Sequence, residues 1–327
     1  MFQAVVLGAT GFIGGHIAKA AKKVDWRVTG FRRHPDRKGH LSSGSIHWFE
    51  GNLMDPRSLK KVMRDADYVF HAAAYYPQGK EPKSVSEHIQ SAREEIGHVL
   101  EAARAANLRR FIYTSSLSTI GTPPPDEERL ANERDVYQPG TFPNNAYYEV
   151  KISMEKAVLE AARDGLPAVI VNPTAVFGPG DVHLTTGQIL VAAAKGKVIV
   201  SPPGTINVID VRDVASSQIA AARNGKVGQR YILGGFNYAV PEALGLIAHT
   251  AGKSPPLFTI PPGVIRAGIR IGDTLPFLPD LPDHLRAFSH WQGMNNQKAK
   301  EELGLSPRLF EETVRDSLKW YQDHGML

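Results

Sequence analysis

Three side chains near the middle of the sequence could together move a proton onto or off an oxygen atom: Ser116, Tyr147 and Lys151. Tyr147 and Lys151 would lie one turn apart on the same face of a helix. A phenol with a pKa of about 10 is a poor acid or base at neutral pH, but a neighbouring ammonium favours the phenolate and lowers that pKa. A serine hydroxyl at a nearby strand end could hold a substrate oxygen beside the phenol. Because Tyr–Lys pairs are common on helix surfaces, this interpretation depends on the elements that position the pair.

A glycine-rich turn at the start of the chain could hold a diphosphate. The residues from 8 to 14 are Gly-Ala-Thr-Gly-Phe-Ile-Gly, between an apolar run and an amphipathic stretch. Gly8 allows a tight turn out of a strand, Gly11 lets a pyrophosphate approach the backbone, and Gly14 lets a helix pack close to the sheet. Helix-end N–H groups would bind the anion. This order predicts dinucleotide binding. The expected contacts are Gly8, Thr10, Gly11, Phe12, Ile13 and Gly14.

The second expected strand, residues 26–31, is followed by Arg32 and Arg33. At this point of a dinucleotide fold, about 20 residues past the glycines, an acidic residue selects NAD, whereas an arginine accommodates the 2′-phosphate of NADP. The two arginines therefore favour NADP, with Arg32 as the preferred ligand. NAD, and a basic loop that merely faces solvent, stay open as alternatives.

Strands and helices alternate along the first half of the chain. The fourth strand is followed by three small residues, Ala72, Ala73 and Ala74. Their small side chains would let the chain pass close to a cofactor, or would simply allow tight packing. Such alternation predicts an α/β fold with a Rossmann-type, doubly wound parallel sheet. The elements expected after residue 31 are strands at 46–50, 67–71 and 109–114 and helices at 56–63, at 87–106 and from 146 onward.

The alternation weakens beyond residue 172. We expect residues 1–172, completed by roughly 206–235, to form the dinucleotide-binding domain. Residues 173–205 and 236–327 would form a smaller, mainly C-terminal substrate-binding lobe. Residues 255–282 are rich in proline and apolar side chains, which fits a core, a partly apolar substrate pocket or the surface of a homodimer.

Composition argues against several other classes of protein. The chain has no cysteine, so no disulfide, thiol catalysis or cysteine-bound metal is expected, and its 12 histidines lack metal-ligand spacing. The net charge is +5 with scattered basic residues, which argues against nucleic-acid binding. No apolar stretch approaches the ~20 residues of a membrane span, and no signal peptide is recognisable. We expect a cytoplasmic protein without a membrane or nucleic-acid partner.

Together these motifs resemble the extended short-chain dehydrogenase/reductase family, that of NAD-dependent epimerases and dehydratases. The glycine turn, the strand from Phe111 to Ser116 and the Tyr147-x-x-x-Lys151 pair occur in the family's order. The segments 169–173 and 229–235 most resemble dihydroflavonol-4-reductase-like and hopanoid-associated sugar-epimerase-like members. The resemblance extends over nearly the whole chain.

The resemblance implies a role for each residue of the motif. Ser116 would orient the substrate oxygen, with Ser115 as a stand-in. Tyr147 would be the general acid or base. Lys151 would lower the pKa of Tyr147 and bind the nicotinamide ribose.

The same resemblance implies further cofactor contacts. The chain departs from the family's pattern at two positions. Asn52 stands where many members carry an aspartate near adenine, and Ala92 stands where an asparagine supports the lysine in many relatives. The additional contacts implied are Asn52, Leu53, Thr114, Asn172 and Pro173, the last two beside the nicotinamide or the substrate.

The function expected is NADP-dependent reduction of a ketone to a secondary alcohol, as in dihydroflavonol reductases, with Tyr147 as the proton donor. One alternative is a nucleotide-sugar epimerase that retains NAD(P), and a second is a non-catalytic, nucleotide-sensing regulator. A 4,6-dehydratase is disfavoured because Leu117 and Ser118, rather than an acidic pair, follow Ser116. The substrate would be a small-molecule carbonyl or a sugar nucleotide.

Overall fold

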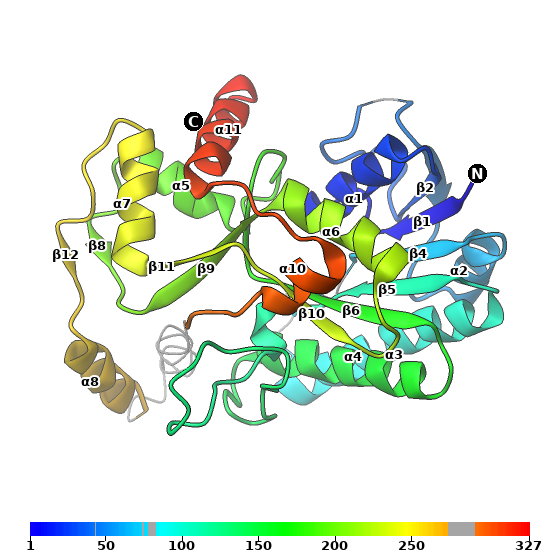
Figure 1. Cartoon of the computed structure of the whole chain (residues 1–327), viewed down its shortest axis with the longest axis horizontal. Helices are drawn as coiled ribbons and strands as arrows, with labels where there is room; N and C mark the ends of the chain where they lie inside the picture. Colours follow the sequence, from blue (N-terminus) through cyan, green and yellow to red (C-terminus); the bar gives the residue numbers. More distant parts are fainter. Residues whose placement is uncertain (43, 74, 78–82, 274–291) are drawn as a thin grey trace.

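The larger part of the protein is built on one seven-stranded sheet. In the computed structural model, which describes all residues except 43, 74, 78–82 and 274–291, its strands have the order β10-β6-β5-β4-β1-β2-β3 (Figure 1). Every neighbouring pair is parallel, which confirms the predicted Rossmann-type sheet. The strands are β1 (Gln3–Leu7), β2 (Arg27–Arg32), β3 (His47–Glu50), β4 (Tyr68–His71), β5 (Arg110–Thr114), β6 (Ala168–Pro173) and β10 (Arg230–Leu233).

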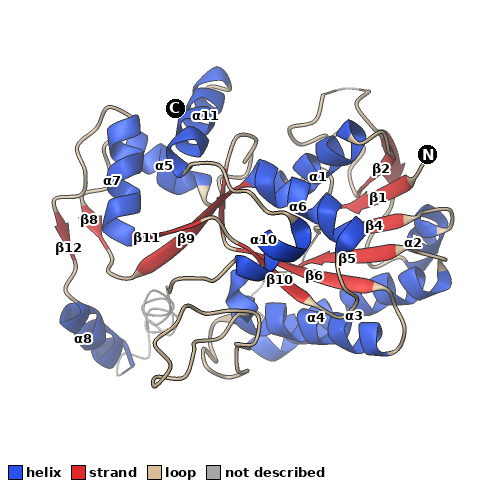
Figure 2. Ribbon diagram, viewed as in Figure 1, coloured by secondary structure: helices blue, strands red, loops and turns tan. Residues whose placement is uncertain are grey.

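Helices cover both faces of this sheet (Figure 2). One face packs on α1 (Phe12–Lys23), α6 (Val211–Asn224) and α10 (Gln297–Leu303), and the other on α2 (Pro56–Met63), α3 (Val85–Ala105) and α4 (Ala146–Arg163). Because side chains alternate along a strand, Val6 of β1 joins the core under α1 while Val5 joins the core under α3. Burial on both faces explains why these strands are continuous apolar runs.

A smaller lobe contains a three-stranded sheet with the order β11-β9-β7. β9 was expected to lie in the part of the chain that completes the main sheet, and this is wrong: β9 pairs with β7 in parallel and with β11 in antiparallel orientation. The reason is that β10 already occupies the edge next to β6. The elements of this lobe are β7 (Ala175–Phe177), α5 (Gly187–Ala194), β8 (Val200–Ser201), β9 (Thr205–Asp210), β11 (Phe236–Ala239), α7 (Val240–Thr250), β12 (Phe258–Thr259), α8 (Pro262–Asp273) and α11 (Phe310–Asp323).

Two strands of the large sheet run almost without interruption into the small one. Only Thr174 separates β6 from β7, and only Gly234 and Gly235 separate β10 from β11. The side chain of Asn207 in β9 joins both links, because its Oδ1 accepts a hydrogen bond from Thr174 Oγ1 at 2.9 Å and from Gly235 N–H at 3.0 Å. A Cβ on Gly235 would lie 2.2 Å from the Val208 carbonyl oxygen, so this link requires glycine.

Part of the apolar segment 255–282 lies outside the described residues. In the part that is described, Leu257 and Phe258 are exposed, whereas Ile265 on α8 is buried. The domain limits and the role of this segment stay predictions. Among the described residues, no helix has both the length and the apolar character that crossing a membrane requires.

Candidate active site

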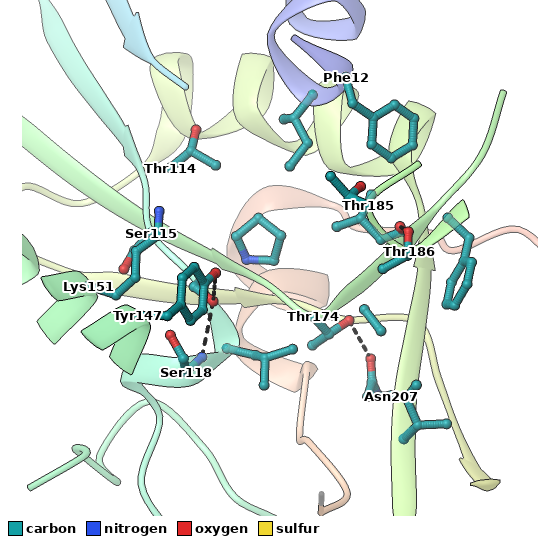
Figure 3. Close-up of a pocket in the computed structure, with 18 of the residues that line it drawn as sticks. Phe12, Thr114, Ser115, Ser118, Tyr147, Lys151, Thr174, Thr185, Thr186 and Asn207 are labelled. Carbon is teal, nitrogen blue, oxygen red and sulfur yellow. Dashed lines mark hydrogen bonds between the residues drawn. The ribbon is translucent and has the colours of Figure 1, made fainter. Parts of the chain in front are cut away.

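A cavity of about 520 Å³ opens at the carboxyl ends of the central strands, where dinucleotide folds bind their ligands. Figure 3 shows Tyr147 and Lys151 on one side of it and Phe12, Thr185 and Thr186 on the other. The cavity therefore lies between the large sheet and the small lobe. The predicted site residues that line it are Gly11, Phe12, Ile13, Gly14, Ala72, Thr114, Ser115, Ser116, Tyr147, Lys151 and Pro173.

The structure brings Ser116, Tyr147 and Lys151 together in this cavity. Ser116 follows β5, and α4 begins at Ala146, so the first two turns of that helix carry the other two side chains. The Tyr147 hydroxyl donates a hydrogen bond to Ser116 Oγ at 3.1 Å, and Ser118 N–H donates to the same oxygen at 3.1 Å. Since both interactions use Ser116 Oγ as the acceptor, its own proton stays available for a ligand oxygen.

The pKa of Tyr147 differs from the sequence-based expectation. Desolvation inside the cavity raises the pKa of Tyr147, and the neighbouring Tyr76 raises it further. The ammonium of Lys151 lies 5.8 Å from the centre of the Tyr147 ring, over the ring. The effect of burial on the pKa of Tyr147 is therefore larger than that of the lysine, and Tyr147 keeps its proton at neutral pH.

Lys151 is a buried cation. Desolvation lowers the pKa of Lys151 to about 8, while the carboxylates of Glu155 and Glu95 oppose that shift. Its ammonium donates no hydrogen bond to any residue that the structure describes. Ala92, on the helix that packs against α4, supplies no polar group there.

Tyr76 is an aromatic site residue that the sequence analysis missed. Its ring centre lies 5.5 Å from that of Tyr147, and the Lys151 ammonium lies 5.9 Å over it. Tyr76 also lines the cavity. A signal was present in the sequence, because two tyrosines follow the run of small residues after β4 at the edge where a cofactor would pass.

Two predicted residues occupy a buried network behind the cavity. Ser115 lines the cavity but donates its hydroxyl proton to Glu155 Oε2, so it is not a free stand-in for Ser116. The Asn172 side chain is fully buried and does not line the cavity. Its amide donates to Glu155 Oε2 at 2.7 Å and to the Ser116 carbonyl oxygen at 3.2 Å, so Asn172 supports the serine from behind.

The glycine turn fits a dinucleotide. Gly8 has a φ of 89°, and a Cβ there would lie 2.7 Å from Ala73 N, so the turn packs directly against the chain after β4. Gly11 precedes α1 and no side chain caps that helix, which leaves its first N–H groups available to an anion. A Cβ on Gly14 would lie 2.1 Å from the Gly8 carbonyl oxygen. The turn thus presents bare backbone to the cavity, as diphosphate binding requires.

The predicted contacts to the adenosine half do not line this cavity. Arg32 is 12% exposed in its side chain, pairs with Glu50 at 3.2 Å and lies 4.9 Å over the Trp48 ring. Arg33 is exposed and donates to the ring of His34. Arg33 is thus the freer of the two predicted phosphate ligands.

The remaining predicted cofactor contacts outside the cavity wall follow the carboxyl ends of β1, β3 and β4. Asn52 is exposed, and its Oδ1 accepts a hydrogen bond from Met54 N–H at 3.0 Å. Leu53 packs against the core under α3, and Ala73 packs against Gly8. Thr10 is half-buried, and Ala74 lies outside the described residues.

The substrate side of the cavity is largely apolar. Among the described residues that line it, Lys151 is the only cation. A second cavity of about 410 Å³ shares part of this wall. No group of three metal-ligating side chains occurs in the described part of the chain. The apolar lining comes from Leu117, Val176, Phe177, Ile189, Ile206 and Met294, and the shared wall from Leu117, Tyr148, Gln292 and Met294.

Comparison with known proteins gives a consistent picture. Residues 4–234 match the model of the NAD dependent epimerase/dehydratase family. The chain is 28% identical, over 98% of its length and 94% of the relative, to a Synechocystis protein provisionally named dihydroflavonol 4-reductase. It is 26% identical, over 99% of both chains, to "Sterol demethylase protein B" of Methylococcus capsulatus. A nucleoside-diphosphate-sugar epimerase structure from Pseudomonas aeruginosa shares the fold with a TM-score of 0.84 at 24% identity, covering 100% of this chain and 99% of that one.

Proposed function

Since the chain belongs to the NAD dependent epimerase/dehydratase family and is therefore an NAD(P)-dependent enzyme, we propose that it reduces a ketone to a secondary alcohol with NADP as cofactor. The observation that carries this proposal is the hydrogen bond between Tyr147 and Ser116 beside the Lys151 ammonium, inside the cavity that the glycine turn also lines. These three groups are what proton delivery to a carbonyl oxygen needs.

The residues of the chain have distinct tasks in this reaction. The first N–H groups of α1 bind the cofactor's diphosphate, and Lys151 binds the nicotinamide ribose. When bound, the nicotinamide supplies the hydride that forms the new C–H bond. The Ser116 hydroxyl donates a hydrogen bond to the substrate's carbonyl oxygen and fixes its position. Tyr147 then transfers its phenolic proton to that oxygen, and the Lys151 ammonium stabilises the resulting phenolate.

Two features favour reduction over epimerisation of a nucleotide sugar. Tyr147 holds its proton because burial raises its pKa, which suits a group that must act first as an acid. The cavity wall is apolar and, among its described residues, contains no cation other than Lys151 to pair with a diphosphate on the substrate. An uncharged ketone with an apolar body suits this wall better than a nucleotide sugar.

NADP is supported by Arg32, the last residue of β2, and by Arg33, which follows it. Arg33 is exposed at the edge where the adenosine ribose would lie, and the neighbouring Arg32 is held there by Glu50 and Trp48. A planar guanidinium can bind a phosphate through two parallel hydrogen bonds. The free 2′-hydroxyl of NAD offers no such pair of acceptor oxygens, so arginines at this position favour NADP.

The test is to mix the purified protein with NADPH and ketones of increasing apolar bulk and to follow the loss of NADPH absorbance. We expect turnover with at least one bulky ketone and none with the Tyr147→Phe variant. Isomerisation of a nucleotide sugar without added cofactor, together with no ketone reduction, would replace the proposal by an epimerase. Cofactor binding without either reaction would favour a nucleotide-sensing regulator.

A further inference from the structure

A buried carboxylate links four elements directly behind the cavity. Glu155 lies one helical turn beyond Lys151 on α4 and is 1% exposed. Its Oε2 accepts hydrogen bonds from Thr119 Oγ1 at 2.7 Å, from Asn172 Nδ2 at 2.7 Å and from the hydroxyl of Ser115. Its Oε1 lies 2.9 Å from Nε of Arg230 on β10. A single carboxylate thus joins α4 to the ends of β5 and β6 and to the edge strand.

Arg230 extends this network to the loop that precedes α4. The guanidinium is buried, and it donates hydrogen bonds to the Thr119 carbonyl oxygen at 2.8 Å and to the Glu133 carbonyl oxygen at 2.9 Å. A buried ion pair is often no more stable than an apolar replacement, because desolvation offsets the attraction. Stability alone therefore gives no reason for charges at this point of the core.

The side chains that contact Glu155 also contact the backbone of Ser116: the Asn172 amide has two N–H groups and can donate to both, whereas the single hydroxyl proton of Thr119 lies within reach of either acceptor. Thr119 Oγ1 lies 2.9 Å from the Ser116 carbonyl oxygen, and Asn172 Nδ2 lies 3.2 Å from it. The orientation of both side chains depends on the Glu155 carboxylate that accepts from them. Movement of that carboxylate would therefore move the serine that contacts Tyr147.

Glu155 also influences the charge of Lys151. The charged and titratable groups that face the ammonium are Glu155 on α4, Glu95 on α3 and His71 on β4, with Tyr147 and Tyr76 beside it. Glu155 gives the strongest stabilisation of the charged ammonium, Glu95 gives less, and His71 is neutral because burial lowers its pKa to about 3. Nearer to Glu155 lie Arg230 and Tyr113, and burial raises the pKa of that phenol, which keeps it neutral.

We propose that Glu155, paired with Arg230, is a positioning residue of the active site: its carboxylate fixes the segment that carries Ser116 and places a buried negative charge one helical turn from Lys151. The catalytic consequence rests on the proposed reductase function, but the effect on Lys151 does not. In this chain, where Ala92 offers no polar partner, the larger carboxylate contribution to the charge of the lysine comes from Glu155 on its own helix and the smaller one from Glu95 on α3.

The test is to measure the titration of Lys151 directly in wild-type protein and in Glu155→Gln. Competitive acetylation with acetic anhydride across a pH series, followed by digestion and mass spectrometry, gives the labelling midpoint of each lysine. We expect the Lys151 midpoint to fall by about one pH unit in Glu155→Gln, as loss of a neighbouring opposite charge does. Exposed lysines in the same digest should keep their midpoints.

Two further variants distinguish the loss of the Glu155 charge from a general disruption of the fold. Glu149→Gln removes another buried carboxylate from α4, one that accepts from the Tyr137 hydroxyl at 2.7 Å and does not contribute to the pKa of Lys151. It should leave the midpoint unchanged. If Glu155→Gln fails to fold because Arg230 loses its partner, the double variant Glu155→Gln/Arg230→Met leaves no unpaired charge and should show the same fall.

The outcomes distinguish this inference from the proposed function. A wild-type midpoint for Lys151 in a folded variant that lacks the Glu155 carboxylate would overturn the inference, whether or not a ketone is reduced. A lowered midpoint with no ketone reduced by the wild-type protein would support the charge role and reject the reductase. With an active wild type, Glu155→Gln should lower kcat at least tenfold and shift its pH profile while the KM for NADPH changes little.

Discussion

Adding one methyl group at Gly11 should weaken nucleotide binding while the protein stays folded. Gly11 has φ −84° and ψ 174°, which any residue adopts, and a Cβ there would meet only the Gly8 carbonyl oxygen, at 3.2 Å. The native chain can accommodate that contact by a shift of a few tenths of an ångström. The methyl group would, however, occupy the backbone surface against which a diphosphate must lie. We expect Gly11→Ala to weaken NADPH binding at least tenfold, about 1.4 kcal/mol.

Gly14→Ala is the matched control, because it should act on the fold instead. A Cβ at Gly14 would lie 2.1 Å from the carbonyl oxygen of Gly8 and 2.7 Å from its carbonyl carbon, so the backbone itself must move. Overpacking of this kind costs roughly 2 kcal/mol. For a chain of 327 residues, that cost lowers the melting temperature by about 3 °C, from an unfolding entropy of about 2.1 cal/mol/K per residue.

The assay is a fluorescence titration with NADPH together with a thermal melt of each variant. Gly11→Ala should melt within about 1 °C of the wild type, since its predicted cost is well under 1 kcal/mol, and should bind weakly. Wild-type NADPH affinity in a folded Gly11→Ala variant would refute the reasoning, since a diphosphate would then not lie against this turn.

Three further outcomes are expected. Tyr147→Phe should lower ketone reduction by about 10²–10⁴-fold with NADPH affinity unchanged, and undiminished turnover would contradict its role as the acid. Arg33→Ala and Arg32→Ala should each weaken NADPH far more than NADH in binding titrations, and equal losses for both nucleotides would reject the phosphate assignment. In urea titrations, the free energy of unfolding should fall as the pH drops from about 6.5 toward 5. Burial lowers the pKa of His16 and of His71 to about 3, so the unfolded chain binds protons that the native state does not, at about 1.4 kcal/mol per pH unit for each histidine. A flat profile over that range would show that these rings are accessible to protons in the native state.

Local patterns predicted the main sheet well, because buried parallel strands are distinctive apolar runs. Helix α2 begins and ends as predicted, at Pro56 and Met63. Helix α3 begins at Val85, two residues before the prediction. Ser84 and Glu87 form a capping box, with the Ser84 N–H donating to Glu87 Oε2 at 2.7 Å. That pair was visible in the sequence and would have given the correct start.

The active-site residues were predictable only where they are close in sequence or belong to a recognisable motif. Ser116, Tyr147 and Lys151 meet because one strand end and one helix start are fixed by the same sheet. The contact between Glu155 and Arg230 depends on which strand lies beside β6, and no local pattern encodes that choice. The protonation of Tyr147 likewise depends on desolvation, which is a property of the folded cavity.

The two short links between the sheets constrain how the small lobe could move against the large sheet. The small lobe is joined to the large sheet through Thr174 and through Gly234 and Gly235, and Asn207 bonds to both links. Any rotation of the lobe must twist the peptide next to Pro173, which forms part of the cavity wall. A rotation of the small lobe would therefore also change the shape of the cavity at Pro173.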